Sequence, residues 1–203
     1  GVNFFILDQG NSRIIRSDYN LVFSDELRFN YNPDLQLLGK IAALAYSRFG
    51  NMYLVDPDNL KVIVLDKDYA RQQELFPAGG FAHCALIRLT AAGDVYVYDR
   101  DRNTIYIFDS FGNPDGKIAL SGVGELGDFE PQSEQLIATD KERNELVVLG
   151  RDGSVIAATG SSGGGGLNFA NPTGLAVRAD GKIFVCDTGN NRIVIYEIAA
   201  ALP

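Results

Sequence analysis

Short apolar runs that each end in an aspartate recur along the chain. Successive aspartates are 41 to 48 residues apart, a spacing expected of repeated supersecondary units. The five runs are FFILD, MYLVD, VYVYD, LIATD and IFVCD, and they end at Asp8, Asp56, Asp99, Asp140 and Asp187. The chain is therefore an array of repeats, and a polar residue in one copy must be judged against the other four.

A polar turn of four residues and a second apolar run follow each aspartate. The sixth residue after the aspartate is aliphatic in every copy, namely Ile14, Val62, Ile105, Leu146 and Ile193. An asparagine stands three or four residues after the aspartate, namely Asn11, Asn59, Asn103, Asn144 and Asn190. Because asparagine tolerates the left-handed backbone of tight turns, each copy predicts a β-hairpin.

The hairpin strands are apolar at consecutive positions, as in VIVL, IYIF, LVVL and IVIY. A strand with one face in water alternates apolar and polar residues, so these strands are expected to be covered on both faces. Inner strands precede three of the hairpins, in IAALA, CALIRL and GLAV, and outer strands follow four of them. No segment shows a convincing 3.6-residue period. The prediction is an all-β fold, a β-propeller of four-stranded antiparallel blades.

Residues 1–203 are expected to form a single β-propeller domain with five detectable blade hairpins. The hairpins are accompanied by only four inner and four outer strands. Five blades with an incomplete closing blade, part of a six-bladed ring, and strands supplied by a partner chain are the alternatives. The inner strand of the fourth blade, around EPQSEQ, is expected to be short or irregular because Glu134 replaces a turn glycine.

The segment FANPTGLAVRADGKIFVCDTGNNRIVIYE resembles the NHL repeat, a family of propeller blades. The matching positions are Pro172, Gly174, Gly181, Asp187, Gly189, Asn190, Arg192 and Ile193. FFILDQGNSRII is similar through Asp8, Gly10, Asn11, Arg13 and Ile14, whereas the three middle copies depart from the motif. The resemblance implies a non-enzymatic module for protein interaction or scaffolding. It also brings two alternatives, an RNA-binding domain and a hydrolase or lyase with a divalent metal in the central channel.

The turn motif is interpreted as structural because it recurs, whereas a catalytic residue is normally unique. Residues that flank a four-residue turn face each other across the hairpin, which predicts the exposed charge pairs Asp8/Arg13, Asp56/Lys61 and Asp187/Arg192. The glycines between Gly122 and Gly127 fit a dinucleotide fingerprint only superficially, because Pro131 prevents the helix that such a site needs. They are interpreted as a linker.

Composition narrows the possible partners. A net charge of −8 and a pI near 4.6 argue against DNA and disfavour RNA. No apolar run reaches the length of a membrane helix. Cys84 and Cys186 are expected to be small buried residues, and His83 is the only histidine, which excludes a three-histidine zinc site. No catalytic residue, metal or cofactor is predicted.

The turns carry more basic than acidic residues although the whole chain is acidic. The basic residues are Arg13, Lys61, Arg100, Arg102, Lys141, Arg143 and Arg192. Because equivalent turns of a propeller project on one face, these residues predict a face that binds an acidic protein, in a larger complex, or an anionic polymer. Propellers that resemble this one are common among exported bacterial proteins, so the resemblance favours the periplasm or secretion.

Overall fold

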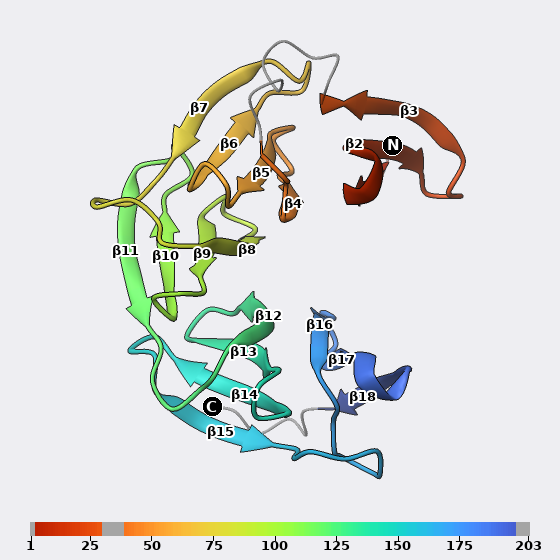
Figure 1. Ribbon diagram of the computed structural model, residues 1–203, viewed down its shortest axis with the longest axis vertical. Helices are drawn as coiled ribbons and strands as arrows, with labels where there is room; N and C mark the ends of the chain where they lie inside the picture. The colour runs from red at the N-terminus through yellow and green to blue at the C-terminus, as the bar shows by residue number, and fades with distance from the viewer. Residues whose placement is uncertain (1–2, 30–38, 198–203) are drawn as a thin grey trace. The chain divides into compact units, whose positions relative to one another are not determined.

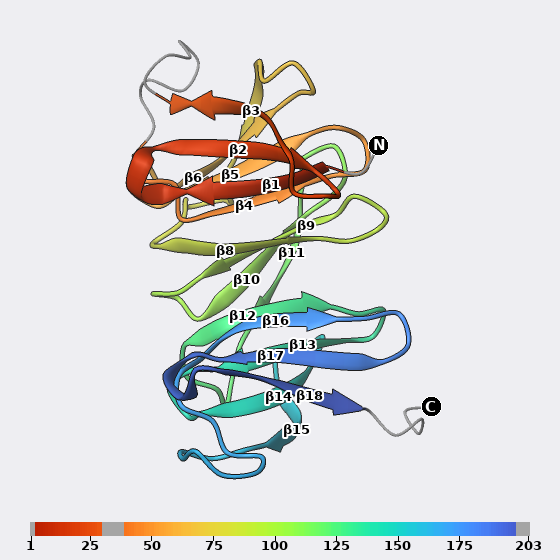
Figure 2. The same cartoon turned by 90° about the vertical axis from the view of Figure 1, so that its right-hand side faces the viewer.

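The computed structural model describes residues 3–29 and 39–197 of the chain. The chain divides into two compact units, Gly1–Arg102 with Tyr106–Gly116, and Asn103–Ile105 with Lys117–Pro203. Each unit consists of small antiparallel sheets (Figure 1, Figure 2). The single-domain organisation of residues 1–203 stays a prediction.

Three sheets account for the first unit, although the first residues of β10 and the last residues of β11 group with the second unit. The first sheet contains β1 (Asn3–Asp8), β2 (Arg13–Asp18) and β3 (Phe23–Arg28). The second contains β4 (Ala43–Tyr46), β5 (Met52–Asp56), β6 (Lys61–Leu65) and β7 (Arg71–Leu75). The third contains β8 (Cys84–Leu89), β9 (Val95–Asp99), β10 (Thr104–Phe108) and β11 (Pro114–Ala119).

Two sheets form the second unit. One contains β12 (Leu126–Pro131), β13 (Gln135–Asp140), β14 (Glu145–Gly150) and β15 (Val155–Thr159). The other contains β16 (Pro172–Val177), β17 (Lys182–Asp187) and β18 (Arg192–Glu197). In all five sheets, strands that are neighbours in sequence are neighbours in space. This order confirms the predicted β-propeller class, its five hairpins and its four inner and four outer strands.

The fourth inner strand differs from the expectation. β12 begins within the glycine segment that was interpreted as a linker. It has six residues, as β8 and β16 do, and its pairing with β13 shifts between Leu126 and Asp128, as the pairings of β8 and β16 also shift. Asp128 is buried although its side chain is acidic. Its carboxylate accepts the main-chain N–H groups of Phe129 at 2.8 Å and of Leu175 at 3.0 Å, and these bonds compensate the burial.

Within each unit, one side of a sheet packs on the next sheet of the chain. We call this side the forward face and the opposite side the rear face. The forward face of β1–β3 packs through Phe5, Leu7 and Ile14 on the rear face of β4–β7. In the second unit, the forward face of β12–β15 packs in the same way on the rear face of β16–β18.

Burial of both strand faces is confirmed for some strands only. Every residue of β5 and of β9 is buried, which agrees with their unbroken apolar sequence. In β18, by contrast, half-buried residues alternate with exposed ones, because only its rear face is packed. The residues of β1 are also exposed or half-buried.

Candidate functional site

The aspartates that end the first hairpin strands are buried in four of the five copies. Asp56, Asp99, Asp140 and Asp187 have no exposed surface, whereas the side chain of Asp8 is 24% exposed. The sequence predicted exposed charge pairs at Asp8, Asp56 and Asp187, and burial corrects that prediction for Asp56 and Asp187. A buried carboxylate needs several donors, so the surroundings of each aspartate show what the turn requires.

Each buried aspartate accepts a main-chain N–H from the loop that leads into the inner strand of its own sheet. The distances from the amide nitrogen to the carboxylate oxygen are 2.7 Å for Ala82 and Asp99, 2.7 Å for Gly124 and Asp140, 2.7 Å for Ala170 and Asp187, and 3.2 Å for Gly39 and Asp56. The donor is always glycine or alanine. This bond fastens the inner strand to the hairpin.

The sequence contained a signal for this bond that was missed. The donor lies 16 or 17 residues before the aspartate, and in FAHC, VGEL and FANP it follows an apolar residue and precedes a polar one. Phe81, Val123 and Phe169, the apolar residues before the donor, are all buried. At the two glycine donors even a Cβ would be crowded: on Gly39 it would come within 2.4 Å of Asp58, and on Gly124 within 2.4 Å of Glu142.

In the last copy, side chains complete the shell around the aspartate. Asn190 Nδ2 donates to Asp187 at 2.8 Å and Arg192 Nε donates at 2.7 Å. Burial by itself raises the pKa of Asp187, but the N–H of Ala170 and the two side-chain donors outweigh it, so the pKa lies below its ordinary value. Arg192 also donates to the carbonyls of Gly164 and Asn168, and these bonds hold the preceding loop.

In the third and fourth copies, main-chain amides take the place of those side chains. Asp99 accepts the N–H groups of His83 at 3.0 Å and Arg102 at 3.3 Å. Asp140 accepts those of Glu142 at 3.0 Å and Arg143 at 2.9 Å. The side chains of these turns are therefore less involved in holding the carboxylate.

The turn asparagines have two different roles. Those three residues after the aspartate donate through Nδ2 to its carboxylate, at 2.8 to 3.0 Å for Asn11, Asn59 and Asn190. The left-handed backbone lies one position later in every turn, at Ser12, Leu60, Asn103, Asn144 and Asn191. Only Asn103 and Asn144 therefore have the conformational role that the sequence predicted for all five.

Two of the three predicted cross-strand charge pairs are formed. Arg13 Nε lies 2.8 Å from Asp8, and Arg192 Nε lies 2.7 Å from Asp187. Lys61 faces Asp56 in the register, as predicted, but its ammonium lies 2.9 Å from Glu74 on the outer strand. The Asp56 carboxylate already accepts hydrogen bonds from Asn59 and Gly39, and Lys61 pairs with the exposed Glu74 instead.

The other basic residues predicted to form an interaction face also have acceptors. Lys141 lies 2.7 Å from Glu125, and Arg143 lies 3.8 Å from Asp140. Arg100 lies 2.9 Å from His83 Nε2 and 3.9 Å from Asp101. Arg102 contacts Asp99 at 3.6 Å and donates to the carbonyls of Gly79 and Gly80. Of the seven basic residues, Arg143, Arg100 and Arg102 have the most exposed side chains, at 46%, 39% and 39%.

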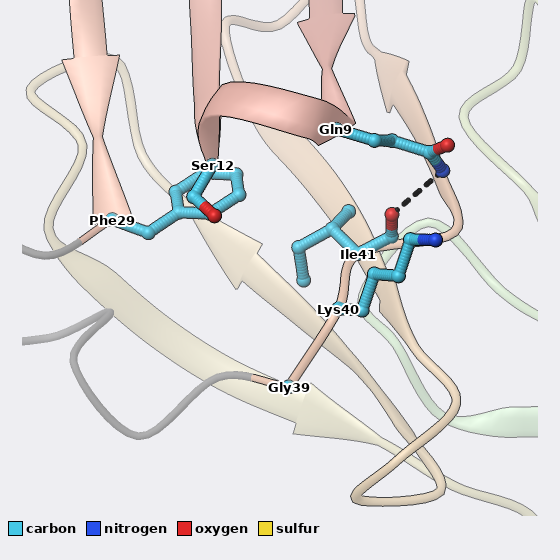
Figure 3. Close-up of a pocket in the computed structure, with 6 residues that line it drawn as sticks. All are labelled: Gln9, Ser12, Phe29, Gly39, Lys40 and Ile41. Atoms are coloured by element: carbon cyan, nitrogen blue, oxygen red, sulfur yellow. Dashed lines mark hydrogen bonds between the residues drawn. The ribbon is translucent and has the colours of Figure 1, made fainter.

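A small cavity of about 330 Å³ opens beside the first turn (Figure 3). It is lined by Gln9 and Ser12 of the turn, Phe29 after β3, and Gly39, Lys40 and Ile41 before β4. The Gln9 amide donates to the carbonyl of Ile41 at 2.9 Å and to that of Ala42 at 3.1 Å. Phe29 and Gly39 flank residues 30–38 in the sequence, which lie outside the described part of the chain, and we assign no ligand to the cavity.

Two chemical features were sought in residues 3–29 and 39–197. No group of three or more His, Cys, Asp or Glu side chains is arranged to hold a metal ion there. No helix in these ranges is long and apolar enough to cross a membrane. The two cysteines differ: Cys84 is buried as expected, but Cys186 is exposed on the forward face of β17, so the prediction of burial is wrong for Cys186.

A comparison with known protein families identifies the last repeat of the chain. The family model described as the NHL repeat matches residues 169–196. These residues are an NHL repeat. The match begins at Phe169 and therefore includes the donor of the Ala170 bond as well as the Asp187 turn. A search of curated protein sequences finds no match.

Solved structures share the propeller fold with this chain at low sequence identity. A streptogramin B lyase superposes with a TM-score of 0.64 at 16% identity over 98% of this chain and 66% of that one. Virginiamycin B lyase from Staphylococcus aureus gives 0.61 at 13% identity over 97% and 67%. A structure of a nidogen/laminin complex gives 0.69 at 16% identity over 96% and 75%. The chain thus spans about two thirds of the lyases, and the likeness concerns the fold alone.

Proposed function

We propose that this chain is a non-enzymatic protein-binding module that recognises its partner through the hairpin turns. One observation carries the proposal: the residues shared by the copies hold the turns, while those that differ are exposed. Asp187, Asn190 and Arg192 are engaged in fixing the last turn. Arg100 and Arg143 stand in turns where main-chain amides hold the aspartate, so their side chains can be used for recognition.

In the first unit, the β9–β10 turn offers the best-defined surface. Arg100 and Arg102 lie on either side of Asp101, and His83 from the loop before β8 contacts Arg100. The β1–β2 and β9–β10 turns lie on the same side of this unit (Figure 2). An acidic segment of a partner fits this local basic surface, because complementary charges raise association rates and fix orientation. Occurrence of a propeller of the same fold in a nidogen/laminin complex is consistent with a protein partner.

The experiment is a binding measurement with a matched charge control. The partner is first isolated from the native source by cross-linking and co-purification, and then purified. Arg100→Glu and Arg143→Glu, tested separately, are expected to weaken its binding at least tenfold at low salt. Arg48→Glu makes the same charge change in the exposed β4–β5 turn and is expected to have little effect. Binding that is unchanged in both turn variants would contradict the proposal.

An enzyme is the alternative, because two lyases have the same fold. His83, the histidine of the chain, lies beside the charged side chains of Arg100 and Asp101. A divalent ion found in stoichiometric amount by elemental analysis, together with an activity abolished by chelation, would favour the enzyme over the binding module. Loss of that activity in His83→Ala would locate it.

A further inference from the structure

We propose that two copies of this chain associate through the outer strand β15, whose outer edge pairs antiparallel with the β15 of the second copy. One sheet of each copy then continues into the other across the contact. The pairing surface is the rim of a sheet and not a hairpin turn. The inference therefore goes beyond the proposed recognition of a partner by the turns and does not depend on it.

One edge of β15 has no strand beside it in residues 3–29 and 39–197. The strand ends the order β12-β13-β14-β15 of its sheet and pairs with β14 (Figure 1). Its residues Val155–Thr159 form no main-chain hydrogen bond with any other described segment. The N–H and C=O groups of this edge can therefore pair with one more strand, and an extended segment is the occupant that satisfies them.

The side chains of β15 do not protect this edge. The strand reads VIAAT, without a charged residue, proline or glycine. Its first four residues are exposed, including Val155 at 37% and Ile156 at 57%. Natural proteins protect open edges with charges, proline or bulges, because an apolar edge readily pairs with another chain.

The three other outer strands of the described sheets do carry charges. They are the end strands of their sheets, as β15 is, and β3 and β7 also share its bulge. The charged residues and proline of these strands are Asp25, Glu26 and Arg28 in β3, Arg71 and Glu74 in β7, and Pro114, Asp115 and Lys117 in β11. The uncharged edge is thus a property of β15 and not of the fold.

A second copy is the occupant that the charges favour. Because the chain carries a net charge of −8, two copies repel each other, and a contact between them needs a surface without acidic residues. No charged residue occurs between Asp152 and Arg178, and β15 lies in this segment. In β3, by contrast, a strand paired with its own copy around Asp25 or Glu26 would place like charges opposite each other.

The regular part of β15 indicates the register of the pair. The strand follows β14 without a break from Ala157 to Thr159, after a bulge at Ile156. A two-fold pair centred on Ala158 therefore places this residue opposite its own copy, and Ala157 opposite Thr159. Ile156 then lies opposite Gly160, so a large side chain meets a residue without one. Because both copies use the same surface, the contact is isologous and closes at a dimer.

Sedimentation velocity over two decades of protein concentration tests the pairing. The unaltered chain is expected to show monomers and dimers and nothing larger. Ala158→Lys and Ala158→Glu each place like charges opposite each other, so each is expected to raise the dimer dissociation constant by about tenfold or more. Mixed in equal amounts, the two variants are expected to dimerise again, because lysine then faces glutamate.

Gln72→Lys is the matched control, because Gln72 is exposed on the outer strand β7, whose edge already carries charges. It is expected to dimerise like the unaltered chain, and circular dichroism checks that all variants are folded. An unaltered chain that stays monomeric at every concentration would overturn the inference, and a strand of another protein would then be the remaining occupant. So would a mixture of the two Ala158 variants that stays monomeric, or a Gln72→Lys variant that dissociates as fully as Ala158→Lys.

Discussion

The last turn and the third turn each hold a buried aspartate at the equivalent position, but the hydrogen-bond donors around the two carboxylates differ. Around Asp187 the donors are one main-chain N–H and the side chains of Asn190 and Arg192. Around Asp99 they are the main-chain N–H groups of Ala82, His83 and Arg102. The comparison teaches that the family motif describes one of two ways to satisfy the aspartate. A turn that lacks the motif can keep the same architecture and present different side chains.

The largest effect is expected when the aspartate itself is removed. Asp187→Ala and Asp99→Ala each leave several buried donors without an acceptor, so each is expected to lower the free energy of unfolding by about 3 kcal/mol. Urea denaturation followed by circular dichroism measures the loss, with Asp101→Ala, an exposed carboxylate in the same turn, as the control. If only the Asp187 variant were destabilised, the two turns would not be equivalent.

Removal of a side-chain donor should separate the two turns. Arg192→Ala loses the bonds to Asp187, Gly164 and Asn168, and about 2 kcal/mol of stability is expected to disappear with them. The same denaturation experiment on Arg143→Ala should give a much smaller loss, because main-chain amides hold Asp140. Equal losses in the two variants would show that side chains matter as much outside the motif as within it.

Acid should weaken the last turn through Asp187. The pKa of its carboxylate is lower in the folded chain than the ordinary value of 3.8, so the unfolded chain binds this proton more readily. The carboxylate therefore contributes its full stabilisation above that ordinary value and loses it as the pH falls through the lower, folded pKa. Unfolding free energies measured from pH 6 downwards should decline less steeply below about pH 4 in Asp187→Asn than in the unaltered chain. Parallel curves would contradict this assignment.

The sequence predicted the architecture well because its signals are local. Consecutive apolar residues such as those of MYLVD and VYVYD, followed by a polar turn, were sufficient to predict the hairpins and the blade class. The strand β12 was harder to predict, because its sequence LGDFEP has no run of apolar residues. The buried Phe129 is followed by an acidic residue and preceded by another, Asp128. The hydrogen bonds that satisfy the Asp128 carboxyl group come partly from Leu175, 47 residues away, and no local sequence pattern indicates them.

The site was less predictable because it depends on contacts between distant segments. The sequence identified the five aspartates but placed three of them in exposed charge pairs, since nothing near Asp187 indicates that Ala170 will reach it. Similarly, the position of Lys61 opposite Asp56 suggested an ion pair between them, whereas Lys61 forms its ion pair with Glu74 of the outer strand β7. The small residues Ala82, Gly124 and Ala170 recur at nearly constant distance from their aspartates, so a comparison between copies does contain this information.

The smallest effect on stability is expected where the turns differ most from the motif. Arg100 is partly exposed and contacts His83 and Asp101, so Arg100→Ala should change the unfolding free energy by less than about 0.5 kcal/mol. Its counterpart in the last copy is Thr188, which bonds to Thr173 within the second unit. A residue that contributes little to folding can be changed for binding without loss of the fold. If Arg100→Ala destabilised the chain as strongly as Arg192→Ala, the third turn would use its side chains as the last one does, and Arg100 would be a structural residue.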